Sequence, residues 1–216
     1  MTGFERARSE AQKAQRRDAL LAAAAALLDG QDFDGITLAA IAREAGFTRS
    51  NLYKYYRTRE AIYLDLLSRE LTDWTAAFAA ALALEPATSA GFAAAWAGTL
   101  SPRPRLLRLL AILHTHLERG VSLERLVAYK RVLFQAMTQA VAALCARWPA
   151  LDPEAAEGLL TVQVATVSGL FPMTHLNARQ QQAAEAVGFR SYAGRFEGLC
   201  RAAAQAGLAA ALAEAG

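Results

Sequence analysis

The chain has 216 residues and a formal net charge of +3; 54% of its residues are hydrophobic and 20% are charged. This length and apolar content suffice for a buried core in one or two domains, which excludes a disordered chain. The two cysteines, Cys145 and Cys200, have no metal-ligand spacing, so we expect small buried side chains and neither a disulfide framework nor a metal site.

An apolar segment at residues 19–28 follows Arg16 and Arg17 and could be mistaken for a signal peptide. It is too short to cross a bilayer, and its leucines recur every seven residues, as the core-facing positions of one helix do. We therefore predict that this segment is the first helix of a cytoplasmic protein.

The next segment, residues 37–60, reads TLAAIAREAGFTRSNLYKYYRTRE and has the composition of a helix-turn-helix. It contains three threonines of the type that caps a helix start, namely Thr37, Thr48 and Thr58. These caps predict helices that begin at Leu38, Arg49 and Arg59.

Three small or apolar residues fit the geometry of such a turn. Ala42 is small where two helices approach closely, Gly46 lies where the chain must adopt a positive φ, and Leu52 returns an apolar side chain to the core. An ordinary helical hairpin in an alanine-rich chain could contain the same three residues, so the interpretation depends on what surrounds them.

The predicted helix after the glycine carries seven hydrogen-bonding side chains and one aliphatic one, Leu52. Arg49 and Asn51 have the donors and acceptors that read guanine and adenine edges, and the others can reach phosphates or a thymine methyl group. Residues 43–59 also hold five basic side chains against one acidic one, Glu44. The alternative is a solvated surface helix, but two tyrosines beside the charges favour a surface that faces DNA.

The stretch ITLAAIAREAGFTRSNLYKYYRTREAIY resembles the N-terminal DNA-binding domain of the TetR family of bacterial transcriptional regulators, and the resemblance covers residues 20–67. Members of this family usually carry phenylalanine where this chain has Tyr56, which keeps an aromatic side chain there. The resemblance implies a DNA face in which Tyr53 and Arg59 contact the phosphate backbone. Its residues are Thr37, Thr48, Arg49, Ser50, Asn51, Tyr53, Lys54, Tyr55 and Arg59.

Beyond residue 60 the charges nearly balance and helical periodicity continues. We therefore predict a DNA-binding domain at residues 1–60 and a larger helical domain at residues 61–216. Breaks at prolines and glycines divide the larger domain into five or six helices, at Pro86, 101–104, 120–122, 149–153 and Pro172. The predicted fold is all-α, with about nine helices in total.

Two local patterns refine the larger domain. Asp152 precedes Pro153 and Glu154, and this order of an N-cap acid, a proline and a second acid predicts a helix start. Residues 161–167 are rich in β-branched side chains and could suggest a strand, but both flanks continue the helical periodicity. We therefore predict one helix through this run.

The same resemblance implies that the last two helices form a dimer interface. A dimer also has an independent argument, because one short recognition helix contacts few base pairs and a two-fold pair doubles the readout. Two apolar stripes fit this interface, and the intramolecular core is an equal alternative for each residue. The stripes contain Leu160, Val164, Val167, Tyr192, Phe196 and Leu199.

The larger domain should also enclose a pocket for a small-molecule effector, as the resemblance implies. Large or polar side chains are the candidates for its walls, with ordinary core packing as the alternative. These candidates are Trp74, Phe78, Trp96, His114, Glu118, Tyr129 and Phe134.

Catalysis is not expected, because the chain contains no HExxH, GxGxxG, P-loop or nucleophile-elbow motif. His114 and His116 would point about 200° apart on a helix and could not share a metal ion, whereas His114 and Glu118 share one face as a hydrogen-bonded pair.

We predict a homodimeric transcriptional regulator without a cofactor. It would repress by binding a palindromic double-stranded DNA operator, and it would release this operator when a small molecule binds. The alternatives are a ligand-independent architectural DNA-binding protein and, less in keeping with the motifs, a helical enzyme.

Overall fold

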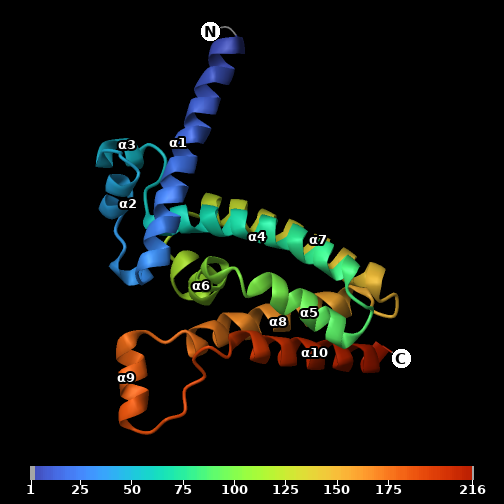
Figure 1. Cartoon of the computed structure of the whole chain (residues 1–216). Helices are drawn as coiled ribbons and strands as arrows, with labels where there is room; N and C mark the ends of the chain where they lie inside the picture. The colour runs from blue at the N-terminus through green and yellow to red at the C-terminus, as the bar shows by residue number, and fades with distance from the viewer. Residues whose placement is uncertain (1–2, 216) are drawn as a thin grey trace. The chain divides into compact units, whose positions relative to one another are not determined.

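The computed structural model describes the backbone of residues 3–215 and the side chains of residues 11–215. Within that range the chain has no strand and confirms the predicted all-α fold, with ten α-helices, one 3-10 helix and one π-helix (Figure 1). The elements in chain order are α1 (Gly3–Gly30), η1 (Phe33–Gly35), α2 (Leu38–Glu44), α3 (Arg49–Tyr53), α4 (Arg59–Leu84), α5 (Ser89–Leu100), α6 (Pro104–Ile112), the π-helix η2 (Leu113–Leu117), α7 (Leu123–Arg147), α8 (Pro153–Thr174), α9 (Ala178–Ala186) and α10 (Phe196–Ala215).

The three predicted threonine caps are confirmed. The Oγ1 atom of Thr37 accepts a hydrogen bond from the amide of Ala40 at 3.1 Å, and that of Thr48 accepts from Asn51 at 3.3 Å. Thr58 does the same at the start of α4, where its Oγ1 accepts from the amide three residues later at 3.2 Å. Each bond satisfies an amide that lacks an intrahelical partner, so α2, α3 and α4 begin at the predicted residues.

The chain divides into two compact units. Unit 1 comprises the chain up to Ser68 together with His114–Tyr129, and unit 2 comprises Arg69–Leu113 and the chain from Lys130 onward. Helices α4 and α7 therefore contribute residues to both units. No sequence pattern indicated that His114–Tyr129 would belong with the N-terminal helices, and the domain boundary predicted after residue 60 stays a prediction.

Unit 1 has a small core built by α1 to α4. Leu20 and Ile41 are completely buried, and Ile62 of α4 lies with them among the buried side chains. The hydroxyl of Tyr63 donates to the carbonyl oxygen of Ala24 in α1 at 3.1 Å, so even the polar end of this buried side chain has a partner. This core holds the helix-turn-helix.

Unit 2 is centred on a group of large aromatic side chains from α4, α5 and the end of α7. The ring of Trp96 meets that of Trp74 edge to face at 5.3 Å and that of Phe78 at 5.4 Å. Phe92 connects this group to Trp148 at 6.2 Å. Around it, α10 packs against α5 and α8, and α6 packs against α8.

Several predicted details of unit 2 are confirmed. The carboxylate of Asp152 accepts from the amide of Ala155 at 2.8 Å and starts α8 at Pro153, and the β-branched run at 161–167 lies inside this helix. Cys145 and Cys200 are both free, although only Cys200 is fully buried. Burial raises the pKa of the Cys200 thiol to about 12, so this thiol is inert at neutral pH.

The end of the chain contains one helix that the predicted breaks did not indicate. Helix α8 passes through Pro172 and ends at Thr174, close to the break predicted around Pro172, and α9 follows as an additional helix. Asn177 and Gln180 start α9 with a capping box, in which each side chain accepts from the other residue's amide at 2.9 and 3.0 Å.

Over the described range, no single helix is long and apolar enough to cross a membrane. Only α8 and α9 taken together reach that length and composition, and they are bent by 73° where they meet.

Candidate nucleic-acid interface

The turn between α2 and α3 closes through backbone hydrogen bonds. The amide of Phe47 donates to the carbonyl of Ala42 at 2.8 Å, and the amide of Gly46 donates to that of Arg43 at 3.1 Å. This pair of bonds is the Schellman motif that ends α2, and it requires a positive φ, which Gly46 supplies at 70°. Ala42 is buried, as predicted for a close approach of two helices.

Helix α3 presents a mostly polar surface and is anchored by one side chain. Leu52 is only 1% exposed, whereas Tyr53 is 50% exposed. Of the predicted DNA-face residues, Asn51 and Tyr55 are half-buried. Those that are exposed are Thr37, Thr48, Arg49, Ser50, Tyr53 and Lys54.

Positive charge gathers around this surface. Arg49 and Lys54 are exposed on and beside α3, and Arg43 at the end of α2 and Arg57 after α3 are exposed as well. Glu44 is the one acidic residue between residues 43 and 59. An outward helix with hydroxyl, amide, aromatic and basic groups, in a locally basic region, has the chemistry to contact both base edges and phosphates.

Arg59 does not follow the prediction that it contacts phosphate. Its guanidinium donates to the carbonyl oxygens of Phe33 at 2.8 Å, Asp34 at 3.2 Å and Ile36, and it lies 4.2 Å above the Phe33 ring. Glu60 accepts from its Nε at 3.0 Å. These partners hold the guanidinium against η1, so Arg59 connects α4 to the chain before α2.

The sequence did not predict a role for Arg125, a second arginine near α3. One Nη of Arg125, at the start of α7, donates to Asp65 Oδ2 at 2.9 Å, and the other donates to the carbonyl of Tyr55 at 3.0 Å. The Tyr56 hydroxyl donates to the same Asp65 oxygen at 2.8 Å. Burial, and after it the Asp65 carboxylate, raises the pKa of this hydroxyl, which therefore stays protonated and keeps donating.

The predicted effector-pocket residues fall in both units. In unit 2, Trp74, Phe78 and Trp96 are buried against one another, while Phe134 is 73% exposed on α7. An exposed ring does not form the wall of an enclosed cavity, so the placement of Phe134 argues against its predicted role.

The remaining three candidates lie in unit 1. His114 Nδ1 is 3.2 Å from Glu118 Oε2, which confirms the predicted pair, although the His114 side chain is 74% exposed and Tyr129 is buried. The imidazole of His114 is exposed like the ring of Phe134, and this exposure argues against its predicted role in the wall of a pocket.

Three of the six predicted dimer residues are buried. Leu160 and Val167 on α8 and Phe196 on α10 are buried within unit 2, as the core alternative expected. Val164 and Leu199 are half-buried, and Tyr192 is exposed.

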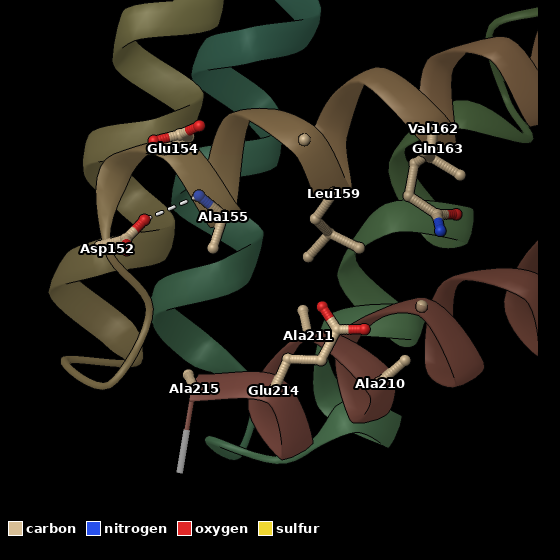
Figure 2. Close-up of a pocket in the computed structure, with 12 residues that line it drawn as sticks. Asp152, Glu154, Ala155, Leu159, Val162, Gln163, Ala210, Ala211, Glu214 and Ala215 are labelled. Atoms are coloured by element: carbon tan, nitrogen blue, oxygen red, sulfur yellow. Dashed lines mark hydrogen bonds between the residues drawn. The ribbon is translucent and has the colours of Figure 1, made fainter.

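A groove of about 580 Å³ lies between α8 and α10 (Figure 2). Small and aliphatic side chains line it, including Leu159 and Val162, and it includes the carboxylates of Asp152, Glu154 and Glu214. None of the predicted effector-pocket residues is part of this lining. Among the side chains that the structure describes, no group of three or more histidine, cysteine or acidic residues is placed to hold a metal ion.

Comparisons with known proteins agree with this arrangement. The family described as "Bacterial regulatory proteins, tetR family" matches residues 20–66, and the one described as "Tetracyclin repressor-like, C-terminal domain" matches residues 68–215. No curated protein matches the chain.

Several solved structures have a similar fold at low sequence identity. The TetR family repressor AlkX from a Dietzia strain is 16% identical, with 89% of this chain and 95% of that chain covered and a TM-score of 0.51. The fatty acid degradation regulator FadR from Bacillus halodurans is 12% identical, with coverages of 89% and 94% and a TM-score of 0.56. RolR in complex with resorcinol is 18% identical, with coverages of 90% and 95% and a TM-score of 0.54.

Proposed function

Because this chain belongs to the TetR family of bacterial regulatory proteins, we propose that it is a homodimeric, ligand-responsive repressor of transcription. It binds a palindromic operator through α3 and releases this operator when a small molecule binds unit 2. The observation that carries this proposal is the recognition helix, which buries Leu52 and turns hydroxyl, amide, aromatic and basic side chains outward. A bacterial repressor works where the chromosome is, in the cytoplasm.

On the DNA face, we assign direct base contacts to Arg49 and Asn51, because their side chains match the acceptor and donor edges of guanine and adenine. Thr48 and Tyr53 are placed for phosphate contacts at either end of α3, with Lys54 just beyond it. Thr37, Ser50 and Tyr55 complete the proposed face.

For the dimer, we propose the outward stripes of α8 and α10 in place of the inward residues. On α8, Gly158, Val162, Ala165 and Gly169 are exposed and recur at the spacing of one helix face. On α10, the exposed alanines at the same spacing are Ala202, Ala206, Ala209 and Ala213. Small side chains let two helix pairs approach closely, and a two-fold interface of this kind sets the distance between two recognition helices.

For the effector, we propose an apolar or aromatic small molecule. All three tryptophans of the chain lie in the aromatic group of unit 2, next to Phe78 and Phe92. Rings of this kind are the usual lining of small-molecule pockets. An effector that enters this group should change the tryptophan fluorescence and, at the same concentrations, release the operator.

The first test selects bound duplexes from a random DNA pool at moderate salt. Recovery of a palindromic motif supports the proposal and provides an operator with which to screen effectors by fluorescence and release. Recovery of unselected sequence favours an architectural DNA-binding protein, and recovery of nothing argues against DNA binding.

The dimer has a separate test by light scattering on a sizing column. The variant Ala206→Glu places a charge in the proposed α10 stripe and should yield monomers, whereas Ala76→Glu at an exposed position of α4 should leave the mass unchanged. A dimeric Ala206→Glu variant would contradict the proposed interface without bearing on DNA binding.

A further inference from the structure

We infer that Arg125 is a positioning residue for the recognition helix, and that it holds the main chain just after α3 in the pose that presents α3 to DNA. This inference rests on the proposed function, since it concerns how the same DNA face is kept in place. Arg125 lies at the start of α7, far along the chain from the helix-turn-helix motif.

Arg125 contacts three groups around the end of α3. Its two Nη atoms bond Asp65 of α4 and the Tyr55 carbonyl at 2.9 and 3.0 Å, and its Cζ lies 5.0 Å from the centre of the Tyr56 ring. The Tyr56 hydroxyl, which phenylalanine would lack, donates to the Asp65 oxygen that Arg125 also contacts. Arg125 and Asp65 thus both bond the short segment between α3 and α4, Arg125 at the Tyr55 carbonyl and Asp65 at the Tyr56 hydroxyl.

The Tyr55 carbonyl explains why this cluster bears on α3 in particular. The last carbonyls of a helix have no intrahelical partner, and α3 has only five residues, so few of its own hydrogen bonds hold it. Arg125 supplies a donor to the carbonyl just beyond the helix and places a positive charge where the helix dipole favours it. Leu52 is the one buried side chain of α3, so the bond from Arg125 adds a second attachment near the C-terminal end of this helix.

The segment that carries Arg125 also contacts η1 and the start of α4, which flank the helix-turn-helix. A Cβ at Gly120 would lie 2.5 Å from Cγ of Glu60, so a larger residue there would force the Glu60 side chain to move. The His116 ring meets the Phe33 ring edge to face at 5.7 Å, and His116 Nε2 is 3.8 Å from Asp34 Oδ1. These contacts fix the segment independently of Arg125, so its guanidinium starts from a defined position.

An ordinary surface ion pair would not carry this inference. The Arg125 and Asp65 side chains are 31% and 35% exposed, and exposed pairs contribute little to stability. What distinguishes Arg125 is that one guanidinium bonds a carboxylate on α4 and a main-chain carbonyl after α3 at once. A planar, forked donor can do this, whereas the single ammonium of lysine bonds one of the two at full strength.

The experiment compares the full-length wild type with Arg125→Met, Arg125→Lys and Arg131→Met. Arg131 is the matched control, because it is exposed on the same helix, six residues further along. Affinity is measured on the operator recovered from the random pool and on an unrelated duplex of equal length. The temperature is chosen so that circular dichroism shows every variant folded. In parallel, amide hydrogen exchange is measured without DNA.

Arg125→Met should weaken operator binding about tenfold, the usual order for losing hydrogen bonds to a charged group. Binding to the unrelated duplex should fall by less than about threefold, because the phosphate contacts of the exposed basic side chains remain. The amides of Tyr55 and Tyr56, which donate to Leu52, should exchange faster, while that of Ile41 in α2 keeps the wild-type rate. Arg125→Lys should be intermediate, and Arg131→Met should match the wild type.

Equal losses on both duplexes, or unchanged operator affinity with unchanged exchange, would overturn the inference. Should Arg125→Met unfold, Arg125→Lys carries the test, and wild-type affinity and exchange in that variant would overturn it. If the wild type recovers no operator, the proposed function fails, and exchange at Tyr55 and Tyr56 alone decides whether Arg125 holds the end of α3.

Discussion

Helices α3 and α9 are both short and both expose most of their side chains, yet they are held in different ways. Helix α3 buries Leu52, follows a closed glycine turn and is bonded by Arg125 just past its end. Helix α9 buries no residue, and the capping box of Asn177 and Gln180 starts it.

Their surfaces differ as well. Helix α3 presents basic, hydroxyl and aromatic groups, and α9 presents mainly alanines and glutamines. Exposure alone therefore does not mark a recognition element. A recognition element combines exposure with an anchored backbone and with side chains that match its partner.

The largest effect is expected at the anchor of α3. Leu52→Ala should destabilise the protein by about 3 kcal/mol, because it removes a buried side chain and leaves a cavity under a helix with no other buried residue. Operator binding should be lost with it. The control Val187→Ala, just after α9, changes a side chain that is 79% exposed and should leave stability unchanged. Urea unfolding measures both, and similar losses in the two variants would contradict the contrast.

The next effect separates a structural cation from a DNA-binding one. Arg59→Met should cost about 2 kcal/mol of stability, because three backbone carbonyls lose a charged donor. The slope of log affinity against log salt should stay at its wild-type value. Lys54→Met should do the reverse, with stability unchanged and the slope smaller by about one. Thermal unfolding measures the stability and a salt titration of DNA binding measures the slope. A reduced slope in Arg59→Met would support the predicted contact of Arg59 with phosphate.

A smaller effect is expected in base discrimination. Asn51→Ala should reduce the preference between operator variants about tenfold at the adenine that we propose it reads, with a lesser change in affinity for DNA in general. Gln181→Ala, an amide on α9, should change neither quantity. Competition binding with single-base operator variants tests both. Equal loss on every variant would count against base reading by Asn51.

The smallest effects are expected at the two N-caps. Thr48→Ala and Asn177→Ala each remove a side-chain acceptor at a helix start and should cost about 1 kcal/mol locally. Thr48→Ala should also weaken operator binding, because α3 carries the proposed DNA face, whereas Asn177→Ala should only reduce the helicity of α9. Hydrogen exchange and operator titration measure the two outcomes, and loss of operator binding in Asn177→Ala would give α9 an unexpected role in DNA binding.

Much of the helix-turn-helix could be predicted from short stretches of chain. Thr37, Thr48 and Thr58 placed three helix starts at the correct residue, and Gly46 marked the turn with positive φ. The additional helix α9 was missed, although its capping box spans only four residues. It was missed because Gly188, which ends it with a positive φ, was not read as a break, while Pro172, which suggested a break, lies inside α8.

Some features of the candidate sites could likewise be predicted from short stretches of chain, and others could not. An outward polar face on α3 followed from the order of its residues, because a single apolar position in a short helix leaves the rest facing solvent. The two stripes, one with Leu160 and the other with Phe196, could each be core or interface by spacing, and only burial distinguished the two. Phe134 is aromatic like the buried Trp74 and Phe78, and only the packing of α7 left its ring exposed.

Helix starts, the glycine turn and the polar face depend on interactions within a few residues, so they can be derived from the order of amino acids alone. The roles of Arg59 and Arg125 depend on partners that lie 23 and 60 or more residues away, such as Ile36, Asp65 and Tyr55. A guanidinium bonds whichever carbonyl or phosphate lies within reach of its flexible stem. Its role is therefore set by which distant segments the packed core brings to it, and this becomes known only once the chain is folded.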